Sequence, residues 1–253
     1  MQAETVPRLL RETPVPVTVT VGIGNDGADI AVFHVGQDKN GVVKTEVFPS
    51  NNNDLADQVV WRPPYLAVIS RSSGNCWNCT GEAVFKIVDD RAVRIGDINL
   101  DYLPEAVPAL PDGQFLTRYA KLESQAGFCH ACSPSFMVVL TEQAGRLVID
   151  AQATWAANAG LWSHAQDVAA TLAAHGMPRG NSDERFAWEL DGFRDLVSAA
   201  ALAKYCDRPD LLKDYLDRLT PHLPSALSGR LNEALALVSP LEPVSQWNSN
   251  APY

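Results

Sequence analysis

Four of the five cysteines form two close pairs with the spacing C-x-x-C. The pairs are Cys76 with Cys79 and Cys129 with Cys132. Each pair could close a disulfide within its own loop, the two pairs could cross-link, or all four thiolates could bind one zinc ion tetrahedrally. Besides disulfides and zinc, the pairs could serve in redox catalysis. A redox-active pair, however, normally lies at a helix N-terminus, which lowers the thiol pKa. Both loops here lead into predicted strands, which argues against it.

We predict disulfides at these four positions and keep the four-cysteine zinc site as the alternative. Zinc knuckles usually carry glycine directly after the second cysteine, whereas Thr80 and Ser133 follow the two pairs here. No resident cofactor is therefore expected, and zinc is the alternative cofactor. The fifth cysteine, Cys206, ends an apolar helical segment and is predicted to be a small buried side chain.

The two pairs belong to an internal repeat. A shift of 53 residues places Cys76 on Cys129 and Cys79 on Cys132, and it also places Gly74 on Gly127. Apolar positions of the following segments coincide without a gap. Self-similarity at a fixed period indicates structural units that bury one face by stacking on a neighbour. We therefore predict that the two units form one continuous β domain with both C-x-x-C loops at the same edge.

Alternating apolar residues separated by Gly, Pro, Asn and Asp predict short strands in the N-terminal half. The expected strands are 17–21, 30–35, 42–48, 59–61, 65–70, 83–88, 92–95, 115–120, 136–140 and 146–150. Strands this short and evenly spaced are typical of an antiparallel sandwich or a partial propeller.

Beyond Ala153 the apolar period changes to that of helices. Trp155, Ala159 and Trp162 fall on one helical face, Asn181 is a candidate N-cap, and Asp207-Arg208-Pro209 begins a further helix. The predicted fold class is α+β, with an antiparallel β domain followed by a small helical array. The expected organisation is an extended N-terminus (1–14), a β domain (15–151), a helical domain (152–238) and a flexible tail (239–253).

The charge balance restricts the possible partners. The chain has 253 residues, 20 Lys and Arg against 30 Asp and Glu, and a formal net charge of −10. An acidic surface disfavours nucleic acid and anionic membranes. No apolar run approaches the roughly 18 residues of a membrane helix. The short polar start, Met1 to Pro7, predicts a mature N-terminus left after signal-peptide removal, hence a periplasmic or secreted protein, with a cytoplasmic location as the alternative.

Among catalytic motifs, G-x-S-x-G, H-E-x-x-H and the P-loop are missing from the sequence. His130 lies inside the second C-x-x-C loop, where an exposed loop residue is the simpler reading. We therefore assign no catalytic residue and no metal ligand apart from the four alternative zinc cysteines, and we predict that the protein is not an enzyme.

The segment from Tyr65 to Phe85, which contains the first C-x-x-C loop, resembles a group of exported bacterial β-repeat proteins distantly similar to FG-GAP/VCBS repeats. Residues 132–141 and 145–149 resemble the strand pair that follows in those proteins. The chain lacks the acidic calcium loops of true FG-GAP repeats, so calcium is not carried over. The resemblance implies an envelope location and supplies no catalytic residues.

Two functions fit these observations. The first is a non-enzymatic binding protein of the bacterial envelope, such as an inhibitor, an immunity protein or an assembly factor, whose partner is another protein. The alternative is a zinc-stabilised intracellular adaptor.

Overall fold

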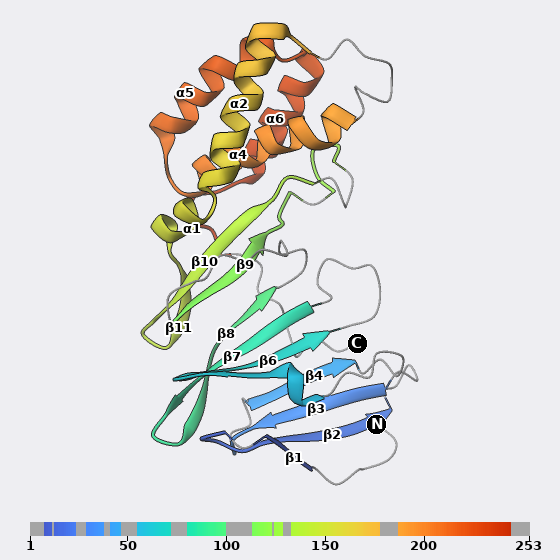
Figure 1. Ribbon diagram of the computed structural model, residues 1–253, viewed down its shortest axis with the longest axis vertical. Coiled ribbons are helices and arrows are strands. Elements are labelled where there is room, and N and C mark those ends of the chain that lie inside the picture. The colour runs from blue at the N-terminus through green and yellow to red at the C-terminus, as the bar shows by residue number, and fades with distance from the viewer. Residues whose placement is uncertain are drawn as a thin grey trace. The chain divides into compact units, whose positions relative to one another are not determined.

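The computed structural model describes most of the chain, in ten stretches. These are residues 8–11, 13–23, 29–37, 41–46, 55–71, 80–99, 113–122, 124–128, 133–177 and 187–243. The chain divides into two compact units. The first comprises Met1–Leu116, Thr141–Val148 and Ser245–Tyr253, and the second comprises Thr117–Leu140 and Ile149–Val244. The fold is mixed, with three antiparallel sheets and a C-terminal half that is mostly helical (Figure 1).

The first unit contains two four-stranded antiparallel sheets. One has the order β1-β2-β3-β4 and the other the order β5-β6-β7-β8. The strands of the first sheet are β1 (Arg8–Arg11), β2 (Val17–Ile23), β3 (Asp29–Val35) and β4 (Val42–Glu46). Those of the second are β5 (Val59–Arg62), β6 (Tyr65–Arg71), β7 (Thr80–Val88) and β8 (Arg91–Asn99). Sequential neighbours pair throughout, as expected for strands joined by short connections.

One core is shared by both sheets. Val17 and Phe33 of the first sheet pack in the same buried cluster as Leu66, Val68 and Phe85 of the second. These residues recur at every second position of their strands, which is the pattern of a sheet with one buried face. The alternation visible in the sequence therefore identified the inward face of this unit.

The third sheet has the order β11-β10-β9, formed by β9 (Gln114–Tyr119), β10 (Phe136–Gln143) and β11 (Arg146–Ile149). Its hairpin resembles that of β7 and β8. Both turn through two residues with positive φ, Asp89 and Asp90 in one and Ala144 and Gly145 in the other, as a type I′ turn requires. Buried, half-buried and exposed positions also follow one another in the same order along β7, starting from Gly81, and along β10. The hairpins thus correspond at an offset of 55 residues, two more than the cysteines.

The hairpin tip between β10 and β11 packs within the first unit. Lys86 Nζ of β7 donates to Glu142 Oε2 at 2.7 Å, and Gly145 N donates to the other carboxylate oxygen at 2.7 Å. Leu147 lies over Gly96 of β8 so closely that an added Cβ would approach its Cδ1 to 2.8 Å. Glycine at position 96 is therefore required by packing.

The second unit is built around a buried helix, α4 (Arg194–Tyr205). Every residue from Leu196 to Ala203 is buried, and α4 packs against α2, α5 and α6. The remaining elements are α1 (Ala151–Ala157), α2 (Ala159–His175), a π-helical turn (Glu189–Phe193), α5 (Pro209–Leu219), a 3₁₀ turn (Thr220–His222) and α6 (Ser225–Leu237). None of the helices in the described part of the chain is long and apolar enough to cross a bilayer.

Asn158 divides the face predicted from Trp155, Ala159 and Trp162 into two helices. Its side-chain nitrogen donates to the carbonyls of Thr154 and Met137, both at 2.7 Å, and its Oδ1 accepts from Met137 N at 3.0 Å. The Asn158 side chain therefore takes the place of a neighbouring strand as the hydrogen-bond partner of Met137. It thereby connects β10 to helices α1 and α2. Trp155 and Trp162 remain in contact, with ring centroids 5.0 Å apart.

Gly192 lies inside the π-helical turn because Trp188 occupies the space above it. A Cβ at position 192 would lie 2.9 Å from Trp188 Nε1. The helix start predicted at Asn181 lies outside the described residues, whereas the predicted start at Pro209 is confirmed. Within the segment predicted as a flexible tail, residues 239–243 are held in place, since Leu241 N donates to Tyr205 O at 2.9 Å.

Candidate functional site

All four paired cysteines lie outside the described residues, so neither the disulfides nor the alternative zinc site can be located. Their flanking residues are described. The first pair is flanked by Arg71 of β6 and Thr80 of β7, in the first unit. The second pair is flanked by Phe128 and Ser133, in the second unit. His130 also lies outside the described part of the chain.

Arg230 of α6 anchors the segment that precedes the second pair. Its Nε donates to Ala126 O and its Nη2 to Gly127 O, both at 3.0 Å. The guanidinium carbon lies 4.5 Å from the ring centroid of Phe128 and 5.3 Å from that of Phe193. Phe128 is buried and stacks on Phe193 with centroids 5.8 Å apart. One cation thus fixes both backbone and aromatic ring.

Serine hydroxyls hold the segment on the other side of the second pair. Ser133 is buried, and its Oγ accepts a hydrogen bond from Ser124 N at 2.9 Å. Ser135 N donates to Ser198 Oγ of α4 at 3.1 Å. The residues before and after the second cysteine pair are therefore both attached to the helical unit.

Cys206 is buried in the second unit, as predicted, with 5% of its surface exposed. Burial raises the pKa of its thiol to about 11, against a smaller opposing effect of Arg208. A thiol this buried and this weakly acidic is a poor nucleophile at neutral pH. Cys206 therefore behaves as a core residue.

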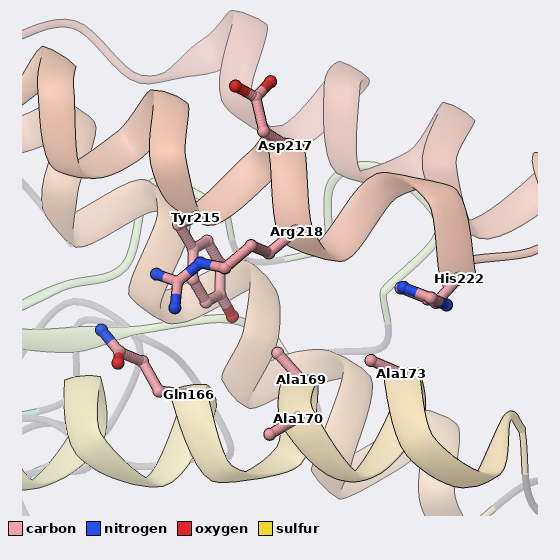
Figure 2. A pocket seen from close by; sticks show the side chains of 8 residues that line it. All are labelled: Gln166, Ala169, Ala170, Ala173, Tyr215, Asp217, Arg218 and His222. Carbon is pink, nitrogen blue, oxygen red and sulfur yellow. The ribbon is translucent and has the colours of Figure 1, made fainter.

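A hollow of about 240 Å³ lies between α2 and the α5 region (Figure 2). Its α2 side is made of small or short side chains, and its other side carries an aromatic ring and two basic groups. The lining residues are Gln166, Ala169, Ala170, Ala173, Tyr215, Asp217, Arg218 and His222. The hollow exists because alanines at three positions of one α2 face leave room opposite α5.

The charged side chains that line this hollow do not neutralise one another. Asp217 points away from α2 (Figure 2) and pairs with Lys213, Nζ to Oδ2, at 2.6 Å. Arg218 Nε donates to the Asp214 carbonyl at 3.0 Å. Among the described residues no ion pair involves Arg218. The hollow therefore presents a cationic group and an imidazole beside an apolar floor, on a chain whose net charge is −10.

Tyr215 forms the rigid inner wall of the hollow. Only 1% of it is exposed, and its hydroxyl donates to Leu196 O at 3.3 Å. Burial raises the pKa of this phenol well above its usual range, so the hydroxyl stays neutral. Its ring contacts Trp162 at 5.2 Å, which in turn contacts Trp155. These three aromatic rings therefore pack α1, α2 and α5 together.

A second polar cluster holds the C-terminal segment within the helical unit. Glu242 accepts a hydrogen bond from Tyr119 OH and one from Lys121 Nζ, each at 2.5 Å. Tyr205 OH donates to the Glu242 carbonyl at 3.0 Å. Burial alone would raise the pKa of Glu242, but the hydrogen bonds from Lys121 and Tyr119 outweigh it and lower the pKa. With every donor paired, this cluster is structural.

The other titratable groups of the described residues occur singly or in isolated pairs. Burial raises the pKa of Glu82, which lies between Ile69 and Ile98 on neighbouring strands. His164 Nε2 lies 3.4 Å from Asp195 Oδ2 but is well exposed. Among the described residues, no group of three or more His, Cys, Asp or Glu side chains is placed to hold a metal ion.

The hollow was not predicted from the sequence. Its signal is the small-residue spacing at 169, 170 and 173 together with Arg218 and His222, which lie four residues apart. The same spacing is also typical of close helix packing, so it does not identify a site alone. No family model, no curated protein and no solved structure matches the chain.

Proposed function

We propose that the protein is a non-enzymatic binding protein of the bacterial envelope and that it binds a segment of another protein in the hollow between α2 and α5. The observation that carries this proposal is an apolar hollow edged by a cation outside any ion pair of the described residues.

The size of the hollow favours a side chain over a cofactor. Sites for small molecules and cofactors enclose about 300–1,000 Å³, whereas this one encloses about 240 Å³. Recognition of a short segment by a few anchoring side chains in such a hollow is the usual mode of helix-lined peptide sites. A rigid wall such as Tyr215 reduces the entropy lost on binding.

The β half supplies the scaffold in this proposal. We propose a β sandwich whose hairpins β7–β8 and β10–β11 descend from one repeated unit, with two residues inserted between the cysteines and the second hairpin. Matching burial orders and matching two-residue turns support the repeat. We propose disulfides within the loops of Cys76–Cys79 and Cys129–Cys132, which would form in the oxidising compartment of the envelope. A zinc-stabilised intracellular adaptor is the alternative.

A peptide selection tests the binding role. The full chain is immobilised and used to select binders from a displayed random peptide library. Binders of the hollow should be lost with Ala170→Phe, which fills it, and kept with Ala174→Phe. Ala174 is a matched control because it is exposed on the same helix and does not line the hollow. If every selected peptide binds both variants equally, the hollow is not the binding site.

A further inference from the structure

We infer that the hollow between α2 and α5 recognises the C-terminal residue of its partner polypeptide: Arg218 binds the terminal carboxylate, and the alanine floor takes an aliphatic side chain. This inference rests on the proposed binding function and goes beyond it by naming the chemical group that is read. It follows from the two kinds of surface that meet in so small a volume.

The floor selects an apolar side chain. Ala169, Ala170 and Ala173 present only methyl groups to the hollow (Figure 2). Tyr215 is only 1% exposed and its hydroxyl donates to the Leu196 carbonyl, so it backs the hollow without offering a donor. A branched or aromatic side chain gains by leaving water here, whereas a charged one would not.

Arg218 selects the carboxylate. Its Nε donates to the Asp214 carbonyl, and within the described part of the chain no hydrogen bond engages its two terminal guanidinium nitrogens. A planar guanidinium binds a carboxylate through two parallel hydrogen bonds. Gln166 lies at the same end of the hollow (Figure 2), where its amide can pair with the peptide group of the terminal residue.

A chain end satisfies both requirements with one residue. The carboxylate and the side chain of a C-terminal residue leave the same Cα, so both fit within about 240 Å³. An internal Asp or Glu carries the charge but no apolar side chain of its own, and a neighbouring residue would have to enter as well. The volume therefore favours the chain end over an internal acidic residue.

Titration with short synthetic peptides tests the inference on the full chain. The probe is a blocked hexapeptide ending in leucine with a free carboxylate, compared with its C-terminal amide and with a hexapeptide carrying internal leucine and glutamate and an amidated end. Binding is followed by isothermal calorimetry and by chemical-shift changes. We expect the free acid to bind up to about fivefold more tightly than the other two, the scale of one exposed charge pair.

Two substitutions assign this preference to the site. Arg218→Gln should abolish the advantage of the free acid and leave the affinity for the amide unchanged. Arg146→Gln, which removes one positive charge from an exposed position of β11 that does not line the hollow, should preserve the advantage. Ala170→Phe should remove binding of all three peptides.

The outcomes separate the inference from the function on which it rests. Equal binding of acid and amide, both lost with Ala170→Phe, overturns the carboxylate inference and leaves the binding function standing. Preference for the internal glutamate peptide also overturns it, in favour of an acidic side chain. Absence of any binding sensitive to Ala170→Phe, in this titration and in the peptide selection, overturns both.

Discussion

Glu242 and its two donors offer a quantitative test of how the C-terminal segment is held. Glu242→Gln removes the charge but keeps an oxygen for Tyr119, a residue that is only 1% exposed. A hydrogen bond to a charged group contributes about 1.5–3 kcal/mol and a neutral one about 0.5–1.5 kcal/mol, so about 1 kcal/mol is lost there. The Lys121 pair adds at most about 1 kcal/mol, because the Lys121 side chain is 49% exposed.

The expected loss of unfolding free energy at pH 7 is therefore about 1–2 kcal/mol. Urea unfolding followed by far-UV circular dichroism measures it, since the α-helices all belong to the second unit. Glu233→Gln is the control, because it removes the same charge from an exposed position of α6. A Glu242→Gln protein as stable as the control would refute the structural role of this cluster.

The pH dependence supplies an independent check with a definite sign. The folded-state pKa of Glu242 is lowered, so the unfolded chain takes up its proton first as the pH falls. The stabilisation is complete above the unfolded pKa of about 4.3 and disappears as the pH falls through the folded value. The wild type and Glu242→Gln should accordingly differ most near neutral pH and converge once the pH has fallen below the folded-state pKa of Glu242. A difference that grows on acidification would contradict this.

Three further predictions concern single residues and the cysteines. Asn158→Ala should destabilise the protein by about 2–3 kcal/mol, because it leaves both Met137 backbone groups unpaired; Asn232→Ala, at an exposed position of α6, is the control in urea unfolding. Cys206→Ser should cost at most about 2 kcal/mol and leave peptide binding unchanged, and the native thiol should react with a thiol reagent only after unfolding. On denatured, unreduced protein we expect one free thiol and no zinc; five thiols with one zinc per chain would establish the metal site instead.

The sequence predicted the elements of the fold better than the site. Apolar and polar residues alternate at residues 17–21 and 65–70 because one face of each strand is buried. Such a pattern is local, so it can be seen in the sequence without knowledge of the fold. The division of the first helix at Asn158 could not be predicted, because it depends on hydrogen bonds to Met137, which lies 21 residues away. The same holds for Gly192, which weakens a helix on propensity alone and is explained only by the position of Trp188.

The hollow escaped prediction for a related reason. Ala169, Ala170 and Ala173 indicate close approach of another helix, and only the placement of α5 shows that a space remains. Arg218 looks in sequence like one more solvated charge of an acidic chain. Its significance comes from a charge that no described residue pairs with, placed next to apolar surface, and that is a property of two helices together.

The surroundings of the two cysteine pairs bear on how the thiols are used. The strands flanking Cys76 and Cys79 belong to the first unit, whereas Phe128 and Ser133, flanking Cys129 and Cys132, are anchored in the second by Arg230 and Ser124. A disulfide within each loop can therefore form when its own unit folds. Cross-linked pairs or a single zinc site would instead need cysteines from both units.

Because a bond within so short a loop constrains the unfolded chain little, reduction should lower the melting temperature only slightly. A large loss of structure on chelation would assign the four thiolates to zinc, whose binding energy contributes directly to folding.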